Sequence, residues 1–426
     1  NYNIHMLKRI LDYTQKLQLV PNVPFLVKPI NEYITENVNK NKYSFIDNNY
    51  SVIVRALKNS NKPKLIIMAH TDHPGIIIKN KNRGIAMGTL ETDRLRTILA
   101  NKPIKLKIFD PGGKYLGTGN LIDIKKNNRD VSLKVDFDVP SNSFGQYDIN
   151  YFKTSDKSVS AYTLDDTISV AVMLSLLEHK FESDYDVYFV FNLYEEVHQI
   201  SSWYLAKNNI LKINKDDIII NLESQKVENV ENKFGLKLNY SSGPILQLSN
   251  TGCLFGYRFN GKNESEIIVS NIAKTLKSKI QIGFAKDSDD SRPFSFFSTT
   301  ANITTLNIPN KYKHNCDDNG RIIPEFVYKK DIEIVSTIIQ EIIQSKPNGS
   351  KDAQSISEKV KKDDTITDTK LMKEKAELNE RLNYAYKYIV KRGYFYPQNF
   401  RDHIQDIVSK FCFYSLYVFQ KIGLFK

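Results

Sequence analysis

Histidine and acidic residues follow four apolar runs of the sequence, and a pair of aspartates begins a helical segment. Imidazole nitrogens and carboxylate oxygens form the mixed ligand set that suits Zn²⁺ or Co²⁺. If the residues converge and one carboxylate bridges, two metal ions would lie about 3.5–4 Å apart and hold one water between them. The candidates are His70 and Asp72 in KLIIMAHTD, Asp165 and Asp166 in YTLDDTISV, Glu195 and Glu196 after DVYFVFNLY, Glu223 in DDIIINLES, and His314 in NIPNKYKHNCDD.

Each of these motifs has an ordinary structural interpretation when it is taken alone. A His-x-Asp at a strand end is more often a hydrogen-bonded loop than a ligand, a Glu-Glu pair is usually solvated surface, and an Asp-Asp pair is usually a helix N-cap. Ligand-binding groups in open α/β sheets, however, gather at the carboxyl ends of the strands. The placement of all five motifs at predicted strand or helix ends therefore favours one assembled site.

Five apolar runs of strand character alternate with helical segments along most of the chain. Continuous apolar strands alternating with helices indicate a buried, mostly parallel sheet with helices on both faces, which is an α/β fold. The predicted strand regions are 44–57, 62–70, 186–194, 216–224 and 301–309, and the predicted helices are 1–17, 163–181, 201–209, 264–278 and 327–343.

The segment 76–158 has a different character, because its short apolar stretches are separated by the turn sequences PGGKYLG and KKNNRD. Those spacings predict a small all-β insert. The stretch after Gln344 is polar and predicts a linker, followed by amphipathic helices. The predicted organisation is 1–75 and 159–345 for the catalytic α/β domain, 76–158 for the insert, 346–370 for the linker and 371–426 for a C-terminal helical extension.

The composition is that of a globular protein. Its 426 residues are 41% hydrophobic, 11% aromatic and 25% charged, which excludes a wholly disordered, collagen-like or membrane-embedded chain. About half of the net charge of +12 lies in the last fifth of the chain, from Lys346 onward. Cys253, Cys316 and Cys412 are widely separated and predict neither a disulfide framework nor a cysteine zinc site. No apolar run reaches the roughly 20 residues that span a bilayer, so we expect a soluble, cytoplasmic protein.

The order of the motifs resembles that of the TET, or deblocking (glutamyl), aminopeptidases. This order is His-x-Asp, β insert, Leu-Asp-Asp with its helix, Glu-Glu after a strand, an acidic residue after the next strand, and a late Tyr-x-His. The resemblance covers roughly residues 5–345 and leaves out the C-terminal tail. It implies a metallopeptidase (phosphorylase/hydrolase-like) α/β architecture with an inserted small β-barrel.

Carried over position by position, the resemblance implies two divalent metal ions per chain, which are zinc or cobalt, with manganese also suited to the ligands. Asp165 would bridge both ions. Glu196 and His314 would complete one metal site, and His70 and Glu223 would complete the other.

The resemblance also implies two residues that act on the chemistry without being ligands. Glu195 would be the general base, and Asp72 would hold His70 in the correct tautomer. His73, His198 and Cys316 lie near the proposed ligands in the sequence. We expect them to be structural residues, because the ligand positions are already filled.

The implied activity is removal of the N-terminal residue from short peptides. Glu223 stands where the family usually has Asp, and Glu at this place accompanies carboxypeptidases and deacylases among more distant relatives. A metal-dependent deacylase or carboxypeptidase is therefore the alternative within the same chemistry. A catalytically inactive scaffold that acts through its tail is the alternative of another class.

The C-terminal sequences KYIVKRGYFY and FCFYSLYVFQKIGLFK mix basic and aromatic residues. Such sequences can stack on nucleic acid or lie on a membrane surface. Because no nucleic-acid motif is recognisable, helix packing or oligomer contact is the favoured interpretation. The resemblance implies a homo-oligomer, with a tetrahedral dodecamer as the common form in the family.

Overall fold

A mixed sheet of twelve strands forms the centre of the larger part of the chain. The computed structural model describes residues 2–38, 43–59, 61–88, 92–125, 129–179, 182–231, 238–247, 263–285, 289–298, 300, 302–317 and 319–346. Four neighbouring strands at the centre of the sheet run parallel to one another. In spatial order they are β12 (Asp186–Asn192), β3 (Lys64–His70), β13 (Ile218–Gln225) and β17 (Ile303–Lys311).

The outer strands of this sheet pair mostly in antiparallel fashion. One edge holds β2 (Ser51–Leu57) and β1 (Ser44–Asn48), and the other holds β15 (Ile245–Gln247), β16 (Gln281–Ala285) and β14 (Val230–Glu231). Three further strands, β18 (Glu325–Tyr328), β11 (Ser158–Ala161) and β10 (Phe152–Thr154), extend from β17. The predicted mostly parallel sheet is thus parallel at the centre, where buried apolar runs occur.

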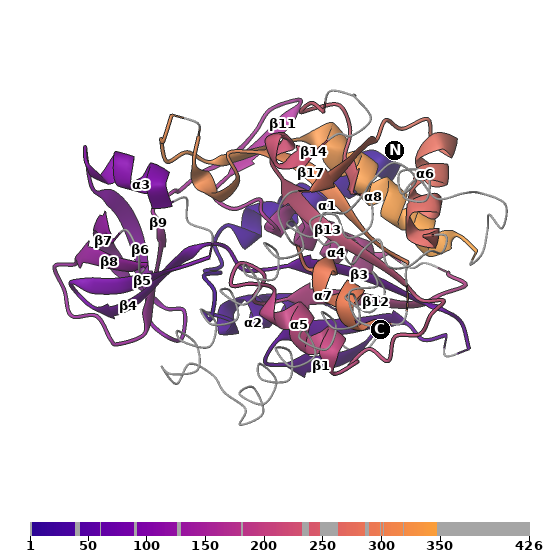
Figure 1. Ribbon diagram of the computed structural model, residues 1–426, viewed down its shortest axis with the longest axis horizontal. Helices are drawn as coiled ribbons and strands as arrows, with labels where there is room; N and C mark the ends of the chain where they lie inside the picture. Colours follow the sequence, from indigo (N-terminus) through magenta and orange to yellow (C-terminus); the bar gives the residue numbers. More distant parts are fainter. Residues whose placement is uncertain are drawn as a thin grey trace, which may run out of the picture.

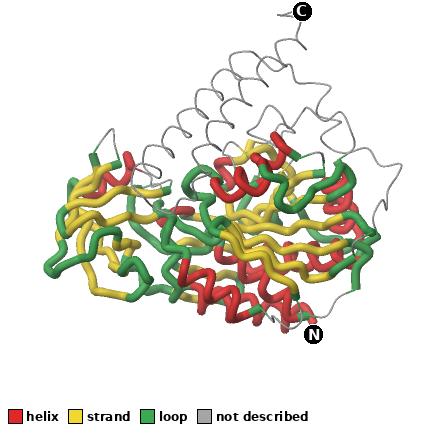
Figure 2. The backbone as a smooth tube through the Cα atoms, turned by 90° about the horizontal axis from the view of Figure 1, so that it is seen from below, coloured by secondary structure: helices red, strands yellow, loops and turns green. Residues whose placement is uncertain are grey.

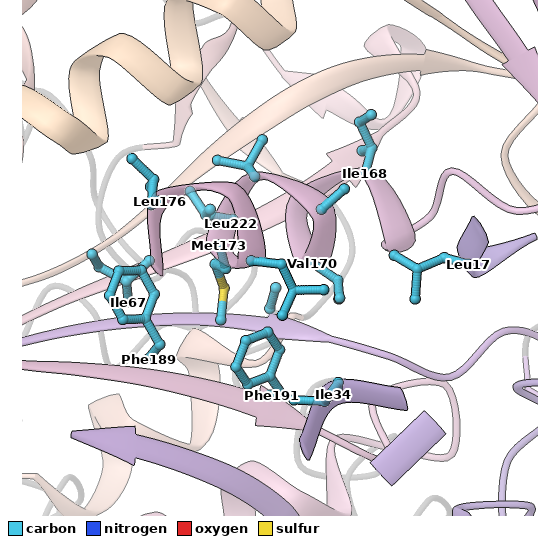
Figure 3. Close-up of a cluster of buried hydrophobic side chains, with 14 of the residues drawn as sticks. Leu17, Ile34, Ile67, Ile168, Val170, Met173, Leu176, Phe189, Phe191 and Leu222 are labelled. Carbon is cyan, nitrogen blue, oxygen red and sulfur yellow. The ribbon is translucent and has the colours of Figure 1, made fainter. Parts of the chain in front are cut away.

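Helices cover both faces of the sheet. One face carries α1 (Tyr2–Leu17), α4 (Thr167–Glu178), α6 (Glu264–Thr275) and α8 (Lys329–Gln344), and the other carries α5 (Ile200–Lys207) and α7 (Ser291–Phe297). A further helix, α2 (Lys28–Asn37), contributes to the first layer. Figure 3 shows α4 against the sheet, with Ile168, Val170, Met173 and Leu176 of the helix gathered with Ile67, Phe189, Phe191 and Leu222 of the strands.

The side chains of β3 show why the two layers form. Leu65, Ile67 and Ala69 belong to the apolar cluster under α4, whereas Ile66 and Met68 belong to the cluster under α5 and α7. Successive side chains of a strand point to opposite faces, so a continuous apolar run needs a helix layer on each side. The predicted α/β fold with helices on both faces is confirmed.

A closed β-barrel of six strands lies at one end of the molecule, apart from the layered part (Figure 1, Figure 2). The barrel also carries one helix, α3 (Thr92–Leu99), which the expectation of an all-β insert did not include. Leu95 and Ile98 of α3 are buried in the barrel core, and their spacing of three residues is that of a helix face. The barrel strands, in spatial order, are β4 (Gly75–Asn80), β5 (Arg83–Met87), β8 (Asp130–Lys134), β7 (Tyr115–Ile124), β6 (Ile104–Phe109) and β9 (Ser143–Tyr147).

The predicted linker and C-terminal helices, together with Cys253 and Cys412, lie outside the described residues, apart from Lys346. Within the described part of the chain, no helix combines the length and the apolar character required to cross a membrane.

A buried aspartate fastens the start of α8 to a loop. Asp331 is fully buried, and its Oδ1 accepts a hydrogen bond from the backbone N–H of Gly243 at 3.0 Å. Gly243 has a φ of 102°, and a Cβ at this position would lie 1.9 Å from the carbonyl oxygen of Lys279, so the turn requires glycine. Burial raises the pKa of Asp331 from 3.8 to about 6.

Replacing Asp331 by asparagine is expected to stabilise the protein at high pH only. Well below pH 3.8 the carboxyl group is neutral in the folded and unfolded states, whereas above pH 6 its ionisation in the buried position destabilises the fold by about 3 kcal/mol. Urea unfolding of the wild type and Asp331→Asn at pH 4.5 and pH 8 measures this difference. A free-energy difference between the two proteins that does not grow with pH would contradict the prediction.

Candidate metal centre

The predicted ligands come from segments that end at one edge of the central sheet. His70 is the last residue of β3, Glu196 follows β12, and Glu223 lies near the end of the neighbouring β13. Asp165 lies just before α4, and His314 lies in the short 3-10 helix η3 (Lys313–Asn315) after β17. Because β12, β3, β13 and β17 are adjacent and parallel, their carboxyl ends bring these residues together.

The first group of ligand atoms surrounds the ring of His70. Its Nε2 lies 3.4 Å from Asp165 Oδ1 and 3.4 Å from Glu223 Oε1. All three residues are buried, and one ligand atom of each lies within 4.8 Å of the others. We call this group the His70 site.

The second group surrounds His314. The Nε2 of His314 lies 3.2 Å from Asp165 Oδ2 and 3.0 Å from Glu196 Oε1. We call this group the His314 site. The two oxygens of Asp165 therefore face different histidines, which is the arrangement of a carboxylate that bridges two cation positions.

Several of the predicted ligand atoms are buried without a hydrogen-bond partner. Five buried ligand atoms form no hydrogen bond, namely His70 Nε2, His314 Nε2, both Asp165 carboxylate oxygens and Glu196 Oε1. Burying a polar atom without a hydrogen-bond partner costs free energy, so a cluster of such atoms indicates a site that binds a ligand. Neighbouring ligands of a tetrahedral zinc ion lie about 3.3–3.4 Å apart, which the distances within both sites approach. The residues therefore fit a divalent metal ion.

Asp72 braces the backbone of the Glu-Glu pair. Its carboxylate accepts hydrogen bonds from the backbone N–H of Glu195 at 2.9 Å and of Glu196 at 3.1 Å. His70 Nδ1 lies 3.0 Å from the carbonyl oxygen of Asp72 and 3.6 Å from its carboxylate. The backbone carbonyl of Asp72 is thus the nearer acceptor for the His70 ring, and its carboxylate links the ring to the Glu-Glu pair.

Glu195 is buried beside both histidine sites. A carboxylate oxygen of Glu195 lies within 4.8 Å of ligand atoms of His70 and Glu196. Its Oε1 accepts a hydrogen bond from Gln199 Nε2 at 3.0 Å. Burial raises the pKa of the Glu195 carboxyl well above its ordinary value, and nearby Glu223 adds to this rise. The Glu195 carboxyl group is thus a buried titratable group beside two of the predicted ligands.

The charges of the ligands depend on one another. Burial alone would raise the pKa of Asp165, but Lys313, His314 and His70 outweigh burial and hold it well below its ordinary value. Burial alone would lower the pKa of His314, but Glu196 and Asp165 raise it to about 10. Without a metal ion, the buried carboxylates therefore stabilise the positively charged forms of the neighbouring histidine and lysine side chains.

Glu325 positions the segments that carry two of the ligands, and the sequence analysis did not identify it. This fully buried residue accepts hydrogen bonds from the backbone N–H of Leu164 at 2.6 Å, of Asp165 at 2.8 Å and of His314 at 2.7 Å. One carboxylate on β18 thereby fastens the loop of Asp165 to the loop of His314. An acidic residue in the otherwise apolar run IIPEFVY was the available signal.

Lys313 is the second residue that the sequence analysis missed. Its Nζ lies 3.2 Å from Asp165 Oδ2 and 3.2 Å from Glu223 Oε1, and it donates to the carbonyl oxygen of Ser224 at 2.8 Å. Burial would lower the pKa of Lys313, but Asp165 and Glu223 outweigh burial and raise it well above its ordinary value. A buried ammonium group therefore lies directly against two of the predicted ligands.

His73 has both ring nitrogens engaged near the site. Nδ1 lies 2.9 Å from the carbonyl oxygen of Asp165, and Nε2 lies 3.0 Å from Asn315 Oδ1. Cys316 is buried and forms no disulfide. Asp166 occupies the N-cap position of α4, but its side chain makes no capping hydrogen bond. His73 also forms a buried group with Asp165 and Glu196 whose ligand atoms lie within 4.8 Å of one another, so its structural role stays a prediction.

Part of the chain matches a known peptidase family model. Residues 118–318 match the family model described as M42 glutamyl aminopeptidase. None of the curated protein sequences matches the chain at a significant level.

Solved structures of aminopeptidases have the same fold. An aminopeptidase from the archaeon Desulfurococcus kamchatkensis superposes with a TM-score of 0.64 at 16% identity over 84% of this chain and 100% of that one. The TET1 dodecamer (PhTET1-12s) gives 0.61 at 18% identity over 79% and 99%, and a TET aminopeptidase from a marine sediment Thaumarchaeota archaeon gives 0.62 at 15% identity over 79% and 96%. The match of residues 118–318 to the M42 glutamyl aminopeptidase model, together with the fold shared with TET aminopeptidases, supports a peptidase.

Proposed function

We propose that the chain is a metal-dependent aminopeptidase that removes the N-terminal residue of short peptides, with Glu195 as general base. The observation that carries the proposal is the convergence of His70, Asp165, Glu196 and His314, whose buried ligand atoms form no hydrogen bond. Glu223 joins this group through His70. Zinc or cobalt suits these nitrogen and oxygen ligands, and manganese is also compatible with them.

The residues of the chain have distinct tasks in this reaction. A bound divalent ion would supply a water of lowered pKa and a Lewis acid for the scissile carbonyl group. Glu195 takes the proton of the attacking water and delivers it to the leaving amine, which requires a carboxylate that is basic enough to hold a proton. The Asp72 carboxylate accepts hydrogen bonds from the backbone N–H of Glu195 and Glu196, which fixes the position of the base relative to the ligand.

A deacylase or carboxypeptidase is the second candidate, and Glu223 is the observation that favours it. The family resemblance leads us to expect aspartate at this position, where the ligand helps to hold the free amino group of the substrate. Glu223 Oε1 is instead engaged by Lys313 Nζ at 3.2 Å and by the backbone N–H of Ser224 at 2.9 Å. These contacts leave less of Glu223 available to bind an amine.

A matched substrate panel separates the two candidates. We expect aminoacyl p-nitroanilides to be hydrolysed at least about 100-fold faster than their N-acetyl counterparts, because a site that binds an amino group rejects a substrate in which that group is blocked. Peptides with free and amidated carboxyl termini should be cleaved at similar rates. Faster cleavage of N-blocked peptides, or a requirement for a free carboxylate, would reject the aminopeptidase in favour of the alternative.

We also propose that the chain works in the cytoplasm and as a homo-oligomer. The assembly proposal is supported by the similar TET1 protein, whose structure is described as a dodecamer. Light scattering of the full-length protein after gel filtration measures the mass of the particle directly.

A further inference from the structure

The ammonium group of Lys313 has three polar neighbours, because it donates hydrogen bonds to two oxygen atoms and forms an ion pair with a third. They are Asp165 Oδ2, Glu223 Oε1 and the carbonyl oxygen of Ser224, at 3.2, 3.2 and 2.8 Å. The side chain is only 12% exposed. A lysine that is this little exposed, with two hydrogen bonds and an ion pair to a buried carboxylate, has a fixed position, unlike a surface lysine that touches one carboxylate.

Two of these acceptors are the same atoms that would hold metal ions. Glu223 Oε1 also lies 3.4 Å from Nε2 of His70, and Asp165 Oδ2 also lies 3.2 Å from Nε2 of His314. The ammonium group therefore contacts one oxygen of each site, Glu223 Oε1 beside His70 and Asp165 Oδ2 beside His314. The His314 site also contains Glu196, which faces His314 at 3.0 Å. The ion pairs of Lys313 within the described residues do not include Glu196.

The charges of the buried centre point in the same direction. Asp165, Glu196 and Glu223 supply three negative charges when ionised, and the two histidines are neutral as metal ligands. One divalent ion and one ammonium group neutralise the three carboxylates. A second divalent ion beside Lys313 would leave an excess of two positive charges over the three ligand carboxylates, which the further buried carboxyl groups Asp72 and Glu195 would have to offset.

We propose that Lys313 replaces the second metal ion, so that this chain holds one divalent ion, at the His314 site, and one ammonium group in place of an ion at the His70 site. This inference rests on the proposed metal-dependent function and revises its ion count from two to one. The local backbone supports a fixed geometry, because Tyr312 and His314, on either side of Lys313, have left-handed φ values of 65° and 61°. Glu325 holds the His314 end of this turn.

Metal stoichiometry tests the proposal without reference to activity. Full-length protein is stripped of metal, incubated with excess Co²⁺, separated from free ions by gel filtration and measured by elemental analysis. We expect about one ion per chain in the wild type and about two in Lys313→Met, which removes the ammonium group but keeps an unbranched chain. The electron paramagnetic resonance spectrum should show an isolated Co²⁺ in the wild type and a coupled pair in Lys313→Met.

Lys311→Met is the matched control. Lys311 lies two residues away over the rings of Tyr240 and Phe326, 4.9 and 5.9 Å from their centroids, so its removal changes the net charge equally without opening the His70 site. We expect one ion in this variant. Lys313→Gln provides a second neutral variant should Lys313→Met not fold.

The outcomes separate this proposal from the proposed function. Two coupled ions in the wild type would overturn the role of Lys313 while leaving a metallopeptidase. One ion in the wild type and also in the folded neutral variants would overturn it as well. No bound ion in any of the proteins would overturn the metal-dependent function itself, and with it the assignment of Lys313.

Discussion

Replacing Glu195 by glutamine is expected to lower kcat/KM for a free-amine peptide by about 10²- to 10⁴-fold, the range that a general base contributes. Glutamine has the same shape but cannot hold the proton of the attacking water. Because Glu195 is not one of the five proposed ligands, the bound metal should be unchanged. The experiment measures kcat/KM with an aminoacyl p-nitroanilide and metal content by elemental analysis on the same samples.

Gln199→Ala is the companion variant for this experiment. The Nε2 of Gln199 donates to Glu195 Oε1 at 3.0 Å, so this change loosens the base without removing its carboxylate. We expect a smaller loss in kcat/KM than in Glu195→Gln. If Glu195→Gln retained activity within tenfold of the wild type, or lost its metal, Glu195 would not be the base. A wild type that binds metal but cleaves no peptide would instead favour the inactive scaffold.

The positions of the predicted ligands could be inferred from a local pattern in the sequence. An apolar run of strand length followed by a polar residue marks a strand end, and parallel neighbours bring their ends together. His70 and Glu196 obey this pattern directly, since they end or follow β3 and β12. Glu223 departs slightly, because β13 continues to Gln225 and places Glu223 inside the strand. The family resemblance supplied the pairing of ligands into two sites.

Lys313 and Glu325 could not be found in this way, because their roles depend on distant segments. Glu325 binds the backbone N–H of Asp165, which lies 160 residues earlier in the chain. A lysine between Tyr312 and His314 resembles a solvated loop residue in the sequence. Only the left-handed turn at Tyr312 and the position of Glu223 on β13 direct its ammonium group inward.

The missed helix of the barrel has a similar cause. The segment of α3 is short and polar, so its periodicity is weak compared with that of α4. Its three apolar residues, Leu95, Ile98 and Leu99, mark a helix face only where the barrel core is there to pack against them. Tertiary packing, more than intrinsic helix propensity, stabilises such a short helix.

Replacing Asp165 by asparagine is expected to remove bound metal and to lower kcat/KM by at least about 10³-fold, since the metal supplies several kcal/mol of transition-state stabilisation. Asp165 is the only carboxylate of the described centre whose two oxygens face both histidines, 3.4 Å from His70 Nε2 and 3.2 Å from His314 Nε2. The variant should lose Co²⁺ in dialysis at concentrations that saturate the wild type.

Asp165→Asn should also destabilise the metal-free protein, by on the order of 3 kcal/mol, because Lys313 then keeps a buried charge with one carboxylate fewer. Asp166→Asn is the matched control. Burial raises the pKa of Asp166 well above its ordinary value, and its side chain makes no capping hydrogen bond, so we expect metal content and stability close to those of the wild type. Equal metal loss in both variants would mean that the loop before α4, and not the shared carboxylate, holds the centre together. Metal loss in Asp165→Asn alone would identify Asp165 as the residue on which the bound ion and the ammonium group of Lys313 both depend.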